Sequence, residues 1–174
     1  MTENLSGSLL IAHPTLRDPN FRRTILFLSQ HSEEDGATGF ILNRPLEDAI
    51  SGPADFENVP VYFGGPVEPS RLVLASLRWL EAPDGVAFRM FVGLGAEDFV
   101  EPEWRHGLRA FAGYAGWHRG QLEAEIEGES WIVVPPSPAL LTIENPATAW
   151  RDFMRSSGPL MHLLSELPDD PSRN

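Results

Sequence analysis

Short apolar runs separated by turn residues recur along the chain and predict a sheet-rich protein. Residues 24–31 and 37–42 form two such runs, and the acidic turn at 32–36 between them predicts a β-hairpin. The run at 8–12 predicts a buried strand before this hairpin. Further strands are predicted at 59–63, 71–77, 86–92, 108–114, 131–134 and 139–143.

Helical patterns are fewer and shorter. Leu122 and Ile126 lie four residues apart and predict a short helix over 121–128. Pro146 predicts a helix over 147–155, because proline suits a first helical turn. A helical turn is predicted at 46–50 and a short acidic helix at 96–106. The last predicted helix covers 160–167. The pattern indicates an α+β fold, with a mixed sheet flanked by three or four helices.

The pattern contains no internal repeat and no linker between independent halves. A chain of 174 residues has the length of one domain. We therefore predict a single domain over residues 1–168 and a polar tail over 169–174.

Composition excludes several kinds of chemistry. The chain has no cysteine, and all 13 of its basic residues are arginine. Disulfides, thiolate nucleophiles, Schiff-base lysines and phosphate-loop lysines are thereby excluded. No basic residue precedes an apolar run near the N-terminus, and no apolar segment is long enough to cross a membrane. We expect a cytoplasmic protein without membrane association.

The net charge of −12 argues against direct binding to nucleic acid, because such binding draws on cations that meet phosphates. Arg22 and Arg23 are adjacent, and the other arginines are scattered along the chain.

One glycine motif follows the predicted strand at 59–63. Gly64 and Gly65 permit backbone conformations that bring another chain segment or a ligand close, and Pro66 then restricts the exit. A tight turn between two strands explains the same three residues without any ligand.

A second motif occupies residues 113–123, where a strand leads into a turn with three glycines and then a helix. Free backbone N–H groups at a helix start can hold an anion. Tyr114 and Trp117 offer flat surfaces, His118 can move protons and Arg119 can clamp an anion. The alternative is that the glycines permit close packing while Trp117 fills the core.

The helix after this turn carries alternating glutamates, most of which we assign to a solvated face. Glu123 lies nearest the glycine turn and is kept as a site residue. The five histidines show no metal-ligand spacing, and the segment 93–98 lacks the third glycine of a dinucleotide-binding loop. We expect neither a metal nor a cofactor.

A series of short blocks resembles the AlgH/YqgE family of bacterial proteins. The order and spacing of the blocks fit from residue 5 to about 155, and the blocks lie at 9–14, 18–24, 31, 36–45, 64–67, 113–117, 120–123 and 130–131.

The resemblance implies an α/β fold with a bifurcated or barrel-like central sheet and flanking helices. It implies no established activity, although some members are labelled as transcriptional regulators. This chain departs from the family at His118 and Arg119, where members usually have glycine and proline. Those two residues are therefore poor candidates for a function shared by the family.

Our first hypothesis is a cytosolic binding protein for a small molecule, an anion or a peptide segment. The predicted cleft combines the two glycine motifs with the end of the hairpin, and its residues are Asn43, Arg44, Pro45, Gly64, Gly65, Pro66, Gly113, Tyr114, Gly116, Trp117, Gln121 and Glu123. One alternative is a regulator that acts through protein contacts. Another is a metal-independent enzyme with Glu123 as base and Asn43 or Arg44 as polariser.

Overall fold

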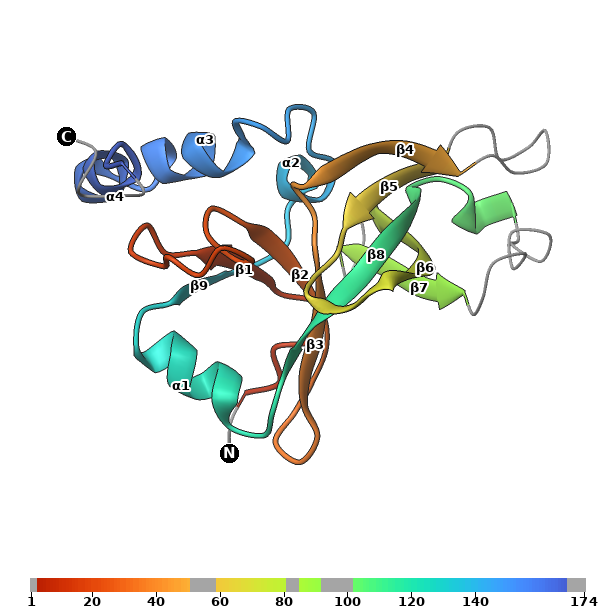
Figure 1. The fold of residues 1–174 in the computed structure, drawn as a ribbon, viewed down its shortest axis with the longest axis horizontal. Coiled ribbons are helices and arrows are strands. Elements are labelled where there is room, and N and C mark those ends of the chain that lie inside the picture. The colour runs from red at the N-terminus through yellow and green to blue at the C-terminus, as the bar shows by residue number, and fades with distance from the viewer. Residues whose placement is uncertain (1–2, 51–58, 81–84, 92–101, 169–174) are drawn as a thin grey trace.

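The computed structural model describes residues 3–50, 59–80, 85–91 and 102–168. Strands dominate the described part, and short helices gather toward the C-terminal end (Figure 1). The elements are β1 (Leu9–Ala12), β2 (Ile25–Ser32), β3 (Gly36–Ile41), β4 (Pro45–Ile50), β5 (Val59–Phe63), β6 (Val67–Trp79), β7 (Val86–Phe91), η3 (Pro102–Trp104), β8 (Leu108–Trp117), α1 (Gln121–Glu127), β9 (Trp131–Val134), α2 (Pro138–Leu141), α3 (Ala149–Ser156) and α4 (Pro159–Ser165).

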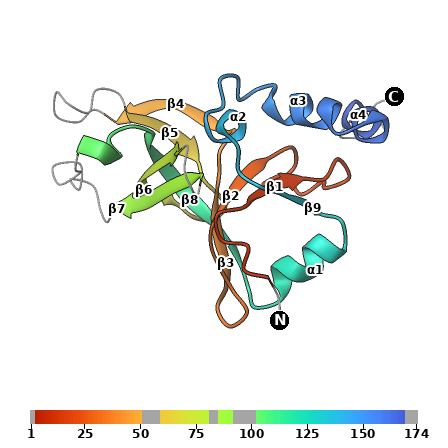
Figure 2. The same cartoon turned by 180° about the vertical axis from the view of Figure 1, so that it is seen from behind.

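Strand β8 belongs to two parts of one curled sheet (Figures 1 and 2). Its first part lies between β5, which is parallel to it, and β6, which is antiparallel. Its last residues pair with β3, and the sheet continues through β2 and β1 to β9. Strand β7 extends the other part by pairing with β6. The sheet is bifurcated at β8 and forms a half-barrel.

The glycine motif after β5 lies at this bifurcation. Gly64 donates its N–H to Ala112 of β8, and its carbonyl accepts from Ile41 of β3, both at 2.9 Å. A Cβ on Gly65 would lie 2.1 Å from the carbonyl carbon of Tyr114. A Cβ on Gly113, whose φ is +74°, would lie 2.4 Å from the carbonyl oxygen of Gly65. The glycines therefore allow two backbones to cross in contact.

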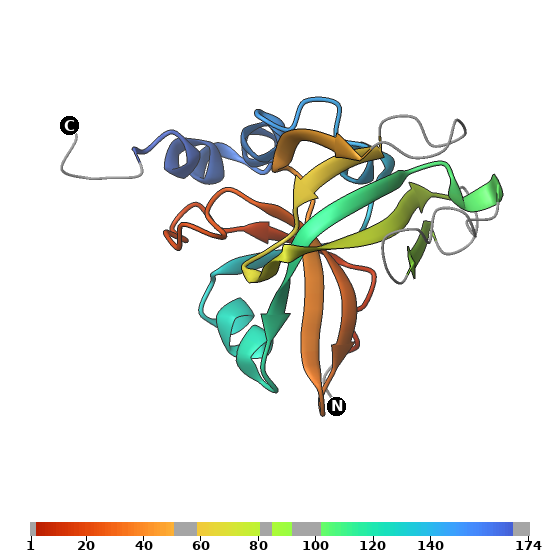
Figure 3. The same ribbon diagram turned by 45° about the vertical axis from the view of Figure 1, so that its right-hand side comes forward.

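The core lies on both faces of the sheet. Figure 3 shows how the sheet curls. One cluster includes Phe40 and Phe111, whose rings stack at 4.6 Å, and it is closed by Trp150 and Met154 of α3. The other cluster surrounds Leu122 of α1. A third, smaller cluster joins β5, β6 and β8 around residues such as Val61 and Ala110.

The predicted hairpin over 24–42 is confirmed as the antiparallel pair β2–β3. The short helix after Gly120 and the two helices near the C-terminus are confirmed as α1, α3 and α4. In the acidic segment 96–106, only Pro102–Trp104 is described as helical, as one turn of 3-10 helix, and residues 96–101 lie outside the described part.

Three predicted elements were wrong. Residues 46–50 belong to strand β4 rather than a helical turn, because they pair with β5. Residues 139–143 do not form a strand. Instead α2 begins at Pro138, and the hydroxyl of Ser137 accepts a hydrogen bond from the N–H of Leu140 as a helix cap. The glycine turn predicted within residues 113–123 is mostly strand, because β8 continues to Trp117 against β3.

Candidate functional site

The site is built first from the loop that leads into β2. The carbonyl of Asp18 accepts hydrogen bonds from the N–H groups of Phe21 and Arg22, and its carboxylate accepts from Asn20. This tight turn leaves Arg23 at a φ of +56°, in the left-handed region that non-glycine residues rarely adopt. Such strain persists only where neighbouring groups hold it.

Asn43 holds the strained residue. Its side-chain oxygen accepts from the N–H of Ile25, and its amide donates to the carbonyl of Arg23, both at 2.9 Å. Asn43 is only 9% exposed. Its predicted place in the site is thus a positioning one, because both ends of its amide are engaged with the backbone.

Arg44 holds the same loop from outside. Its guanidinium donates to the carbonyls of Pro19, Asn20 and Arg22 at 2.7–3.3 Å. Burial lowers the pKa of Arg44, the positive charge of Arg22 lowers it further, and the carboxylate of Asp18 acts in the opposite sense. The guanidinium groups of Arg44 and Arg22 are therefore close enough to repel each other.

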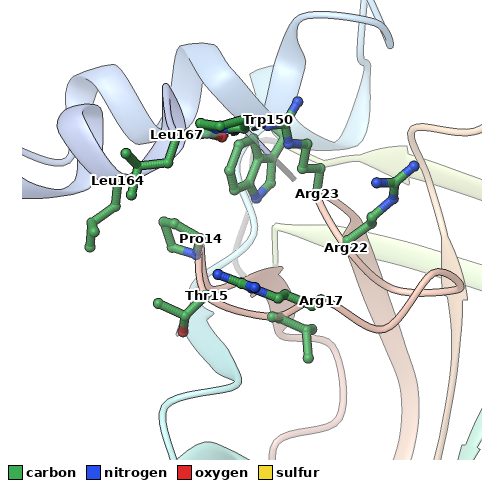
Figure 4. A pocket seen from close by; sticks show the side chains of 10 residues that line it. Pro14, Thr15, Arg17, Arg22, Arg23, Trp150, Leu164 and Leu167 are labelled. Carbon is green, nitrogen blue, oxygen red and sulfur yellow. Dashed lines mark hydrogen bonds between the residues drawn. The ribbon is translucent and has the colours of Figure 1, made fainter. Parts of the chain in front are cut away.

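Trp150 of α3 forms the floor beside this loop. Its indole N–H donates to the carbonyl of Ala12 at 2.8 Å, which fixes α3 to the end of β1. The guanidinium carbon of Arg23 lies 5.5 Å from the centre of the Trp150 ring, and Arg23 also donates to the carbonyl of Leu167. Figure 4 shows Trp150 and Arg23 between the loop after β1 and the end of α4.

Two adjoining cavities open around Trp150. The inner cavity has a volume of about 70 Å³ and is lined by Pro14, Thr15, Leu16, Arg17, Arg22, Arg23, Trp150, Leu164, Leu167 and Pro168. The outer cavity has about 340 Å³ and is lined by Arg22, Arg23, Asn43, Arg44, Pro146, Ala147, Trp150 and Arg151. Because they share Arg22, Arg23 and Trp150, we treat them together as the arginine cavity.

The arginine cavity gathers five of the 13 basic side chains of an acidic protein. The arginines that are scattered along the sequence are therefore clustered in the fold. Arg17 and Arg151 are exposed at its rim. Arginine is the side chain that best suits oxyanions, because its planar guanidinium carries five N–H donors and a fixed positive charge.

The residues predicted around α1 lie elsewhere and have packing partners. Glu125 accepts hydrogen bonds from the indole N–H groups of Trp117 at 2.7 Å and Trp131 at 3.0 Å. Trp117 is 6% exposed, and Gln121 accepts from the N–H of His118. Trp117 therefore fills the core, which is the alternative that its sequence motif left open.

Glu123 binds a buried histidine. Nδ1 of His31 accepts from the N–H of Leu5, so the ring proton lies on Nε2, which donates to Glu123 at 2.6 Å. This hydrogen bond lowers the pKa of Glu123 below its ordinary value of 4.5. A carboxylate held in this way is a weaker base, which argues against its predicted role in an enzyme.

The twelve predicted site residues fall into separate groups. Asn43 and Arg44 lie just beyond the C-terminal end of β3. Glu123 binds His31, which pairs with Ala37 near the N-terminal end of the same strand. The six residues of β3 span about 16 Å, so these two groups of predicted site residues lie far apart. Around the bifurcation lie Pro45, Gly64, Gly65, Pro66 and Gly113, whereas Tyr114 borders a different groove and Gly116 is exposed.

Sequence reasoning missed most of the arginine cavity. Arg17, Arg22, Arg23, Trp150 and Arg151 were not proposed as site residues. Arg22 and Arg23 form the one adjacent pair of basic residues in the chain, and that pair was the available signal. The other residues of the cavity are brought together only by the way α3 lies against the loop that leads into β2.

No group of three histidine, aspartate or glutamate side chains is arranged to hold a metal ion in the described part of the chain. Among the same residues, no helix has the length and apolar character needed to cross a membrane.

Comparison with known proteins identifies the family. The model of the AlgH-like family matches residues 9–162. A UPF0301 protein of Streptomyces avermitilis is 38% identical over 191 residues, which cover 100% of this chain and 98% of the relative. The chain belongs to the AlgH-like family. Another relative, a UPF0301 protein of Mycobacterium leprae, is 37% identical over 97% of this chain and 90% of its own.

Two solved structures match the half-barrel. A crystal structure of a protein from Corynebacterium diphtheriae has a TM-score of 0.70 and 25% identity, covering 95% of this chain and 94% of its own. The solution structure of AlgH from Pseudomonas aeruginosa has a TM-score of 0.64 and 26% identity, covering 97% and 98%. The names of these proteins specify no reaction, so a functional proposal rests on the site itself.

Proposed function

We propose that this protein binds a small polyvalent anion in the arginine cavity. The observation that carries the proposal is that two adjoining cavities beside Trp150, in a chain of net charge −12, are lined by five arginines, namely Arg17, Arg22, Arg23, Arg44 and Arg151. An anion there would offset the repulsion from Arg22, which adds to the larger effect of burial in lowering the pKa of Arg44.

The strained backbone of Arg23 supports the same location. Left-handed non-glycine residues cluster at ligand sites, where the strain places a side chain that relaxed backbone would not. Arg23 lines both cavities, and the carbonyl of the same residue is held by Asn43. Asn43 and Arg44 remain in the proposed site from the sequence prediction, as the residues that fix its loop.

Calorimetric titration with pyrophosphate and with citrate tests the proposal and separates a phosphorylated ligand from a polycarboxylate. The double variant Arg17→Gln/Arg151→Gln removes two rim charges from exposed positions. We expect it to bind the preferred anion about tenfold more weakly. Arg119→Gln, at an exposed turn away from the cavity, is the matched control and should bind as the wild type does.

Two results would overturn the proposal: no saturable binding of either anion at low ionic strength, or equal binding by the double variant and the wild type. A regulator that acts through protein contacts stays a prediction from the family resemblance.

A further inference from the structure

A second opening lies between β7 and the β2–β3 hairpin, which do not pair with each other in the described part of the chain. Strand β7 pairs with β6 on one side only within the described part of the chain. At one level Phe88 of β7 fills the gap, with its ring 4.9 Å from that of Phe27 and 6.1 Å from that of Phe40. Beyond Phe88 the gap is a groove of about 280 Å³.

The groove is mostly apolar. Its apolar and aromatic lining comes from β3, β6, β7 and β8, namely Phe40, Leu72, Val73, Met90, Phe91 and Tyr114. Phe40 and Phe91 are buried, whereas Met90 is 45% exposed. An exposed methionine at the rim of an apolar groove is a side chain that adapts to different ligand shapes.

The polar groups that line the groove differ in whether they already form hydrogen bonds within the protein. Ser29 donates to the carbonyl of Thr38 at 3.1 Å and is satisfied by the protein. The amide of Gln30 and the hydroxyl of Tyr114 form no hydrogen bond with the described residues, so both can serve a ligand.

Arg71 is the one positively charged side chain that lines the groove within the described part. Its guanidinium lies 3.6 Å from the carboxylate of Glu68, and the two side chains are 68% and 56% exposed. An ion pair with this exposure contributes little, so a ligand carboxylate can replace Glu68 at small cost.

We infer that this groove, formed by β2, β3, β6, β7 and β8, is a second ligand site that binds a small amphipathic carboxylate. The apolar body lies against Phe40, Met90 and Phe91, and the carboxylate meets Arg71. The volume is just below the range of about 300–1,000 Å³ that is usual for ligand pockets, which favours a short alkyl chain or a single ring. The site is separate from the arginine cavity, since the two share no residue.

Titration with octanoate, followed by chemical shifts or calorimetry, tests the inference, and 1-octanol serves as the uncharged match. Octanoate should bind saturably and more tightly than octanol. Arg71→Gln should weaken octanoate about fivefold and leave octanol unchanged. Arg119→Gln is the matched control and should alter neither.

Met90→Trp fills the groove from an exposed edge-strand position where an aromatic residue suits the strand. It should weaken both probes at least tenfold. The Arg17→Gln/Arg151→Gln variant should still bind octanoate as the wild type does, which separates this site from the arginine cavity.

Three results would overturn the inference: no saturable binding of octanoate, binding that Met90→Trp leaves unchanged, or a loss in Arg71→Gln that is equal for octanoate and octanol. Concentration-dependent self-association that Met90→Trp abolishes, without octanoate binding, would assign the groove to a second copy of the chain instead.

Discussion

Glu125 shows how one side chain can hold two elements in place. Its half-buried carboxylate accepts the indole N–H groups of Trp117 at the end of β8 and Trp131 at the start of β9. Both indoles lie in the same core cluster, with their ring centres 6.0 Å apart. A charged acceptor shared by two buried donors contributes more than a neutral one.

Replacing Glu125 by alanine should therefore destabilise the protein by about 3 kcal/mol, because two buried N–H donors lose a charged acceptor. Denaturant unfolding monitored by tryptophan fluorescence measures the change. Glu127→Ala, on the exposed side of the same helix, is the control and should stay within about 0.5 kcal/mol of the wild type. Equal stability of the two variants would contradict the role assigned to Glu125.

At the scale of elements, the crossing of the segment after β5 over β8 determines where the sheet bifurcates. Ile41 of β3 and Ala112 of β8 are joined through the backbone of Gly64. Gly113 lies at positive φ with no space for a Cβ, whereas a Cβ on Gly116 would meet nothing nearer than 3.6 Å. The two glycines of one strand thus have different roles.

Gly113→Ala should destabilise the protein by about 4 kcal/mol or more, because the added carbon meets backbone atoms that have no room to move. Gly116→Ala should change the unfolding free energy by less than about 1 kcal/mol, since its backbone suits alanine. Thermal unfolding of both variants measures the contrast. Similar losses for the two would show that the crossing does not constrain Gly113.

A second link between elements joins the β2–β3 hairpin to α1. Nε2 of His31 donates to Glu123, and Nδ1 of the same ring accepts from Leu5. The His31 side chain is 1% exposed and that of Glu123 is 27% exposed. Through this ring the N-terminal segment, the hairpin and the helix are held together.

This link should make stability depend on pH. The hydrogen bond from His31 lowers the pKa of Glu123 in the folded state, so the carboxylate stabilises the fold above the ordinary value of 4.5. That stabilisation is lost as the pH falls through the lowered pKa. The difference in unfolding free energy between wild type and Glu123→Gln should be constant above pH about 5 and shrink below it. A difference independent of pH would contradict this linkage.

At the scale of the whole molecule, charge is unevenly distributed. The net charge is −12, yet five arginines surround one cavity. A positive region within an acidic protein favours small anions over long polyanions, because an extended nucleic acid would also meet the negative surface. The sequence-based prediction against nucleic-acid binding and the proposal of a small anion are thus consistent.

Ligand-linked stability tests this distribution. Pyrophosphate or citrate, whichever binds, should raise the unfolding free energy by about 2.7 kcal/mol at 100 times its dissociation constant. The gain at the same ligand concentration should be smaller in Arg17→Gln/Arg151→Gln. Both effects should weaken as sodium chloride is added, since salt screens exposed charges. Stabilisation that does not change with salt would contradict an electrostatic site.

Prediction from the sequence depended on how far apart in the chain the residues that determine each element lie. The hairpin over 24–42 and helix α1 were predicted because their signals are local, namely apolar runs, a turn and a helical repeat. Strand β4 was missed because its conformation depends on pairing with β5. Helix α2 was missed although Ser137 and Pro138 carry a local start signal, which the apolar residues after them obscured.

For the candidate site, amino-acid composition alone establishes which side-chain chemistry is absent and which cation is available. Without cysteine or lysine, every fixed positive charge is a guanidinium. The fold, in contrast, brings Asn43 and Arg44 to the loop at Arg23. It places Trp117 and Glu123 at the other end of β3. The reason is physical: the arginine cavity forms from segments that meet only when α3 docks on β1 through Trp150, and such contacts leave no periodic pattern in the sequence.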